Sequence, residues 1–179
     1  MANSDPDSHD LDKLTRWRQG LADAGTPEFP VYAVFLVGPE DTFAHNVFRE
    51  FRSSFESRNA PYEHLVIFGQ HGLSKTLHGL RGRLSLSPEE IPLLALTYSP
   101  LAMTFYTLPL PAGSAGDEAG DLTDGGPWRE VLGHIEAASG SSERVLDLER
   151  IVELNLRAIR EGPLESVINK LLLRLSHRG

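Results

Sequence analysis

Residues 69–76 carry the spacing that comes nearest to a known chemical motif in this chain. They read Gly-Gln-His-Gly-Leu-Ser-Lys-Thr and follow an apolar stretch, as in a phosphate-binding loop of the form Gly-x-x-x-x-Gly-Lys-Thr. In such a loop backbone amides surround the phosphates, the lysine reaches the outer phosphates and the hydroxyl holds magnesium. The candidate phosphate-binding residues are Gly69, Ser74, Lys75 and Thr76.

Two departures weaken this interpretation. Ser74 replaces the glycine that permits close approach of the phosphates, and no later apolar strand ends in an aspartate that could hold the metal. The competing interpretation is an ordinary glycine-containing loop in which Ser74 caps a helix.

The sequence contains no cysteine. It therefore has no thiolate for disulfide exchange, for nucleophilic catalysis or for binding a metal, which excludes thiol oxidoreductase activity. The seven histidines lack tight ligand spacing, and no serine stands in a Gly-x-Ser-x-Gly motif. We therefore expect no metal, no cofactor and no catalytic residue, with the 69–76 loop as the alternative route to an enzyme.

The net charge of −8 argues against a nucleic-acid partner, because phosphate binding needs an excess of lysine and arginine. One local exception is the basic stretch Lys75, His78, Arg81 and Arg83, which could take an acidic partner and is more commonly a solvated helix face. The acidic N-terminus is unlike a secretory signal, and no apolar run is long enough to span a bilayer. The expectation is a cytoplasmic protein.

The first half of the chain predicts alternating helices and strands. Helical spacing indicates a helix over residues 10–22, and a continuous apolar run at residues 31–37 is typical of a strand buried on both faces. Phenylalanines at four-residue spacing begin a helix at Phe43, and residues 64–68 form a second buried strand. Strand, helix and strand in this order predict a right-handed βαβ unit.

The second half predicts a helix over residues 73–84, one helical turn at 87–90, and an antiparallel hairpin of strands 93–98 and 103–108. Residues 112–127 are rich in glycine and acidic residues and predict a flexible insert. Helical spacing resumes over residues 128–138. Two further helices, roughly 144–161 and 164–177, are expected after it.

Ile91 and Pro92, followed at once by the apolar run at 93–96, resemble the loop-to-strand junction where the thioredoxin-like family keeps a cis peptide bond. The order of elements from 31 to 138 is similar to that fold. The resemblance implies an α/β three-layer sandwich, with a central mixed sheet flanked by helices and a C-terminal helical extension. The expected parts are residues 1–30, an acidic arm and helix; 31–138, the thioredoxin-like domain; and 139–179, a C-terminal helical pair.

The chain departs from that family where the Cys-x-x-Cys motif belongs, because residues 38–43 read Gly-Pro-Glu-Asp-Thr-Phe. The resemblance therefore implies a scaffold and a groove beside the cis-proline that can accept an extended segment, without redox chemistry. The residues expected to contact a partner there are Glu40, Asp41, Phe43, Ile91 and Pro92.

The last predicted helix is apolar on most of its surface, so it must either pack on the sheet or bury itself against a second subunit. The candidate residues for a homodimer interface are Val167, Leu171, Leu172 and Leu175. The sequence thus predicts a non-catalytic thioredoxin-like binding or assembly protein that engages a protein partner through the cis-proline groove or the C-terminal helices. The alternative is a nucleotide- or phosphate-binding protein.

Overall fold

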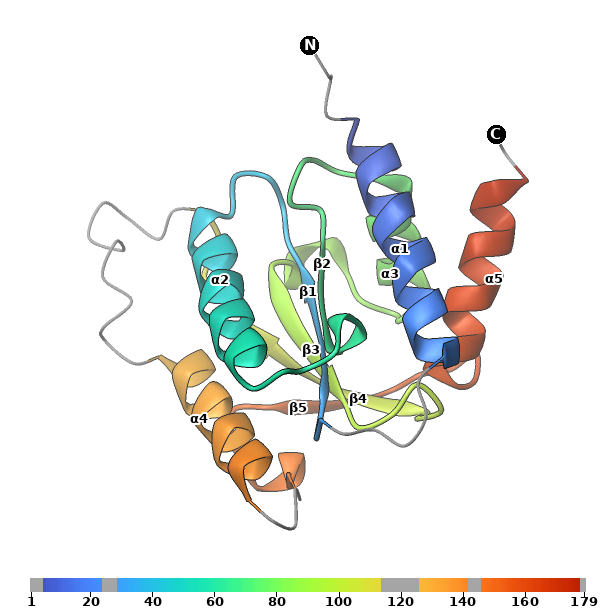
Figure 1. The fold of residues 1–179 in the computed structure, drawn as a ribbon. Coiled ribbons are helices and arrows are strands. Elements are labelled where there is room, and N and C mark those ends of the chain that lie inside the picture. Colours follow the sequence, from blue (N-terminus) through green and yellow to red (C-terminus); the bar gives the residue numbers. More distant parts are fainter. Residues whose placement is uncertain (1–4, 24–28, 114–125, 142–145, 178–179) are drawn as a thin grey trace.

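The computed structural model describes residues 5–23, 29–113, 126–141 and 146–177. Its centre is a five-stranded mixed sheet with helices on both faces (Figure 1). Helices α2 (Thr42–Ser57) and α4 (Pro127–Gly140) cover one face, and α1 (Pro6–Asp23), α3 (Lys75–Arg83) and α5 (Leu164–Ser176) cover the other. The expected α/β sandwich is confirmed at this level.

The predicted βαβ unit consists of β1 (Tyr32–Leu36), α2 and β2 (Leu65–Phe68). The two strands pair in parallel, with Ala33 opposite Leu65 and Leu36 opposite Phe68. Every residue of both strands is buried, which is why their sequences are continuously apolar. The short 3₁₀ turn η1 (Tyr62–His64) leads into β2.

The predicted hairpin consists of β3 (Leu93–Thr97) and β4 (Thr104–Pro109), and β3 pairs antiparallel with β1 on the side opposite β2. The sheet order is β2-β1-β3-β4-β5, so β2 lies at one edge. The Ile91–Pro92 peptide bond is cis, as the sequence predicted. The turn η2 (Pro88–Glu90) precedes it and is held by a capping box between Ser87 and Glu90.

The predicted helix over residues 144–161 is wrong. This stretch contains the turn η3 (Leu148–Arg150) and strand β5 (Asn155–Ala158), which pairs antiparallel with β4. Val152 and Leu156 fall at helical spacing in this stretch, but they are 91% and 58% exposed and form no buried helix face. Residues 155–158 instead pair with the open edge of β4 and form hydrogen bonds with its backbone groups. Residues 139–179 are therefore not a helical pair: in their described part, α4 ends at Gly140 and is followed by η3, β5 and α5.

Two other differences are local. Helix α1 begins at Pro6, earlier than the predicted residue 10, because the Asp5 carboxylate accepts the Asp7 amide and proline suits the first helical position. Most of the predicted flexible insert 112–127 lies outside the described residues.

Candidate functional site

The loop that replaces the Cys-x-x-Cys motif is hydrogen-bonded to the protein's own chain. The buried carboxylate of Asp41 accepts the Gly38 amide at 2.7 Å and the Gly113 amide at 2.8 Å. The Phe43 amide donates to the Gly113 carbonyl at 3.2 Å, and His45 Nε2 donates to the Gly38 carbonyl at 2.9 Å. Asp41 and Phe43 thus hold the segment after β4, and Glu40 is exposed beside them.

The cis-proline is joined to the same segment from its other side, because the Pro92 carbonyl accepts the Leu110 amide at 3.0 Å. The Ile91 amide donates to the Pro88 carbonyl. Ile91 and Pro92 line a cavity of about 320 Å³. Glu90 and Arg157 also line this cavity and form an ion pair with each other. The hydrogen bond from Arg157 lowers the pKa of Glu90. Of the charged residues that line this cavity, Glu90 and Arg157 are therefore paired with each other, and Glu89 lies beside them.

The candidate phosphate loop is filled by carboxylates from α1. Asp10 is 1% exposed and its Oδ2 accepts the Gly69 amide at 2.9 Å and the Ser74 hydroxyl at 2.5 Å. Asp7 Oδ1 accepts the Lys75 amide at 2.7 Å, and Thr76 is buried. Ser74 also caps α3, as the competing interpretation predicted, by accepting the Leu77 amide.

No local sequence pattern pointed to Asp10, because it lies 59 and 64 residues from its two partners. Gly69 has a φ of +91°, and a Cβ there would collide with the Val37 carbonyl. The loop is thus packed closely against β1 and occupied by an internal anion.

The dimer interface expected from the sequence is mostly buried within one chain. Val167, Leu171 and Leu172 pack in the cluster beneath α1 and α3, and Leu175 packs against its margin. Leu173 of α5 is 61% exposed. The reason for expecting a second subunit therefore falls away.

The edge strand β2 offers an open row of backbone groups. The Phe68 carbonyl faces β1, where it accepts the Val37 amide at 3.0 Å. Because neighbouring residues of a strand point their backbone groups in opposite directions, Leu65 and Ile67 face away from β1. Accordingly, the Ile67 carbonyl accepts Lys13 Nζ at 3.2 Å from α1.

The Leu65 amide is also occupied, since it donates to the Tyr62 carbonyl. The Leu65 carbonyl and the Ile67 amide then have no hydrogen-bond partner among the described residues. These two groups flank Val66 and point in the same direction.

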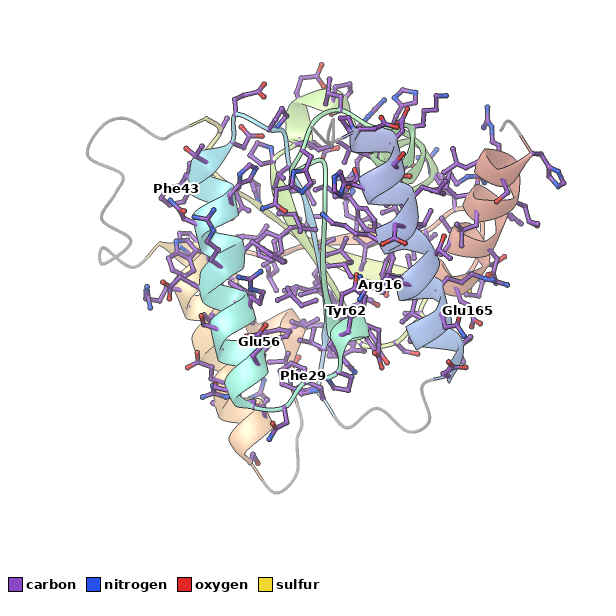
Figure 2. The ribbon with its side chains drawn as sticks, turned by 45° about the horizontal axis from the view of Figure 1, so that its top comes forward. Arg16, Phe29, Phe43, Glu56, Tyr62 and Glu165 are labelled. Carbon is purple, nitrogen blue, oxygen red and sulfur yellow. The ribbon has the colours of Figure 1, made fainter. Side chains whose placement is uncertain are left out.

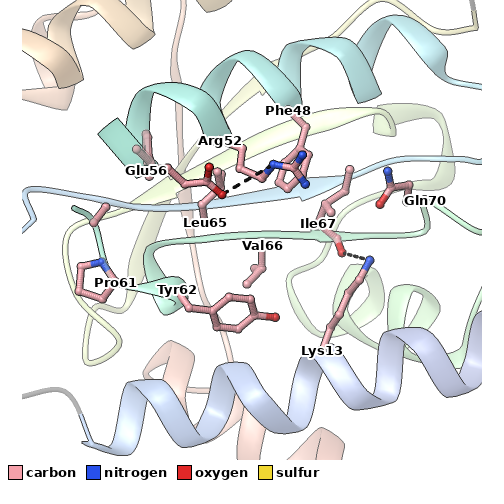
Figure 3. Close-up of a pocket in the computed structure, with 12 residues that line it drawn as sticks. Lys13, Phe48, Arg52, Glu56, Pro61, Tyr62, Leu65, Val66, Ile67 and Gln70 are labelled. Carbon is pink, nitrogen blue, oxygen red and sulfur yellow. Dashed lines mark hydrogen bonds and ion pairs between the residues drawn. The ribbon is translucent and has the colours of Figure 1, made fainter. Parts of the chain in front are cut away.

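A groove of about 230 Å³ runs along this edge between α1 and α2 (Figure 3). Its lining combines the side chains of β2 with apolar and charged residues of the two helices and of η1. The lining residues are Lys13, Phe48, Arg52, Phe55, Glu56, Ala60, Pro61, Tyr62, Leu65, Val66, Ile67 and Gln70.

The charges around the groove are largely paired. Burial lowers the pKa of Lys13, and the nearby Asp10 carboxylate opposes this effect at 3.9 Å. Arg52 and Glu56 of α2 lie 3.9 Å apart. The Arg16 guanidinium lies 4.8 Å from the ring of Tyr62, and Figure 2 shows these two side chains close together beside α1.

The groove lining contains backbone groups, aromatic rings that include the Tyr62 phenol, and paired charges. Within the described ranges no group of three or more histidine and acidic side chains is arranged to hold a metal ion. No helix in the described part of the chain has the length and apolar character needed to cross a bilayer.

Comparison of the chain with protein-family models, with curated proteins and with solved structures finds no match.

Proposed function

We propose that this chain is a non-redox, thioredoxin-like binding protein that holds an extended peptide segment along the open edge of β2. The family resemblance is supported by the sheet order β2-β1-β3-β4, by the parallel β1–β2 pair followed by the antiparallel hairpin, and by the cis bond before Pro92. The absence of cysteine removes the family's thiol chemistry and leaves binding as the function.

The observation that carries the proposal is the pair of unpartnered backbone groups flanking Val66. In strand addition, main-chain hydrogen bonds supply affinity and side-chain pockets supply specificity. A peptide residue opposite Val66 on a strand parallel to β2 would donate its N–H to the Leu65 carbonyl and accept the Ile67 N–H. An antiparallel peptide could use the same two groups, through the residues on either side of the one opposite Val66. In either direction the Lys13 bond to the Ile67 carbonyl limits how far the pairing extends along β2.

The groove walls fit such a segment. Phe48 and Phe55 of α2 offer apolar contact on one side of the edge, and Tyr62, which is 45% exposed, offers it on the other. The groove expected beside the cis-proline is a weaker choice, because Gly113 already bonds the loop at Asp41 and Phe43. Phosphate binding at the 69–76 loop is likewise disfavoured by the Asp10 carboxylate.

The test uses heptapeptides selected on the full chain from a random display library and then synthesised with each amide N-methylated in turn. We expect one internal N-methyl group to weaken binding about tenfold or more, because it removes the single donor to Leu65, while its two neighbours have little effect. Fluorescence anisotropy measures the dissociation constants.

Two variants locate the site. Tyr62→Ala removes a wall of the groove and should weaken the selected peptides, whereas Leu173→Ala, a truncation of another exposed apolar side chain on α5, should not. A failure to select any peptide, or equal affinity for Tyr62→Ala and the native chain, would refute the proposal.

A further inference from the structure

A second and larger groove lies between α3 and α5, away from the edge of β2. Its volume is about 580 Å³. The residues that line it come from these two helices, from the loop before α3, from α1 and from the segment before α5. They are Asp7, Leu73, Ser74, Lys75, His78, Gly79, Gly82, Arg83, Glu161, Leu171, Arg174 and Leu175.

The lining of this groove has more cations than carboxylates, Lys75, Arg83 and Arg174 against Asp7 and Glu161, although the whole chain carries −8. Glu161 pairs with Arg83 at 2.8 Å, and Asp7 accepts the Lys75 backbone amide and keeps its negative charge. The side chains of Lys75 and Arg174 have no hydrogen-bond or ion-pair partner among the described residues. Two cations from different helices therefore remain available to an anionic ligand.

The floor of the groove is apolar and formed partly by backbone. A Cβ at Gly79 would collide with Leu171, so α3 and α5 are in close contact there. At Gly82, one turn later, a Cβ would meet nothing within 4 Å, which leaves open space. Leu73 is 81% exposed at the rim, and Leu175 is half-buried. An isolated leucine so exposed is ordinary, but here it adjoins the cations and the cavity.

We infer that the α3–α5 groove binds an acidic peptide segment that inserts an apolar side chain. The carboxylates of such a segment pair with Lys75 and Arg174, and its apolar side chain fills the space above Gly82. The two free cations are few for a nucleic-acid backbone, whose binding needs many phosphate contacts. The groove is also concave, whereas a membrane surface favours a protruding apolar face. Charge complementarity thus commits the site to an acidic peptide.

The probe is a synthetic helix-forming peptide with leucines at positions i, i+3 and i+7 and glutamates between them, labelled for fluorescence anisotropy with the full-length chain. Its controls are a peptide with lysine at each glutamate position and a scrambled peptide of the same composition. We expect the glutamate peptide to bind, and both controls to bind at least about tenfold more weakly.

Matched variants assign the site. Lys75→Glu and Arg174→Glu should each weaken binding about tenfold. Arg49 is an exposed residue of α2, on the opposite face of the sheet. Arg49→Glu makes the same charge change there and should alter binding less than about twofold. Gly82→Leu should block the groove sterically without touching a charge, and its melting temperature shows that the fold is intact.

The outcomes separate the alternatives. Equal binding of the scrambled peptide, or equal weakening by Arg49→Glu, would mean general electrostatic attraction and would overturn the inference. Binding to vesicles that contain anionic lipid, without binding of the peptide, would assign the groove to a membrane and would also overturn it. Because the β2-edge peptides are tested with Tyr62→Ala, failure at one groove is distinguishable from failure at the other.

Discussion

The Asp10 carboxylate takes the position that an anionic ligand would need in the 69–76 loop. It joins α1 to that loop through the Gly69 amide and the Ser74 hydroxyl, and Lys13 is its neighbouring cation. Its Oδ1 atom is buried without a hydrogen bond, so the carboxylate depends on these few contacts. A buried, paired charge of this kind is costly to disrupt.

We therefore expect Asp10→Ala to lower the free energy of unfolding by about 3 kcal/mol, because it leaves two buried donors unpaired. Asp12→Ala, two residues further along the same helix, removes an exposed carboxylate that lies 4.0 Å from Arg16 and should change stability by less than about 0.5 kcal/mol. Urea titration monitored by tryptophan fluorescence measures both. Similar losses for the two variants would show that the internal contacts of Asp10 contribute little.

His64 makes the stability depend on pH. The ring is 1% exposed, stacks on Tyr32 and donates from Nδ1 to the Val31 carbonyl at 2.8 Å. Burial lowers its pKa below the ordinary 6.5, although the Val31 bond and Glu63 oppose this effect. Below pH 6.5 the unfolded chain therefore binds a proton that the folded chain does not, so stability is present above that pH and falls as the pH is lowered.

We expect this residue to contribute a slope of up to about 1.4 kcal/mol per pH unit between pH 6.5 and the lowered folded-state pKa. His64→Gln should remove that part of the slope, whereas His177→Gln at the exposed end of α5 should retain it. Denaturant titrations at several pH values give the slopes. If the native chain and His64→Gln have parallel profiles, the folded-state pKa of His64 is not lowered.

At the scale of elements, the packing of α3 on α5 depends on two glycines with opposite surroundings. Gly79 allows Leu171 to approach the α3 backbone, whereas Gly82 faces open space. We expect Gly82→Ala to raise the free energy of unfolding by about 0.5–1 kcal/mol, because alanine loses less backbone entropy in a helix. Gly79→Ala should instead lower it, because the new methyl group forces Leu171 away.

Thermal unfolding of the two variants checks this prediction. The variants are a matched pair, because each replaces a glycine of α3 by alanine. A stabilised Gly79→Ala protein would mean that the Leu171 side chain moves away from α3 at little cost, which would contradict close packing at this point. The result also bears on the α3–α5 groove, because its floor exists only if the two helices are held together there.

At the scale of the whole molecule, α5 serves the core of its own chain. Leu172 is 8% exposed and Leu173 is 61% exposed, so adjacent leucines have opposite environments. We expect Leu172→Ala to cost about 2–4 kcal/mol of stability, since it leaves a cavity in the core. Leu173→Glu should change stability by less than about 0.5 kcal/mol.

Light scattering of the native chain and of Leu173→Glu should give the same mass, near the 19.7 kDa of one chain. A native dimer that Leu173→Glu dissociates would instead support the interface that the sequence suggested. The two leucine variants thus distinguish packing within the chain from packing between chains.

The sequence by itself determined the elements whose signals are local. The phenylalanine spacing of α2, the continuous apolar runs of β1 and β2, and the junction at Ile91 and Pro92 all reflect periodicity or backbone restriction within a few residues. These signals were enough to predict the βαβ unit, the hairpin and the layered α/β architecture.

Only the tertiary structure decided the rest. Residues 155–158 became a strand because the open edge of β4 was available to pair with them, which overrides a local helical pattern. The Asp10 contacts, the Lys13 bond to the Ile67 carbonyl and the charged α3–α5 groove each join residues distant in the chain. Burial and pairing of a polar group depend on which distant elements pack against it, and that arrangement exists only once the core has formed.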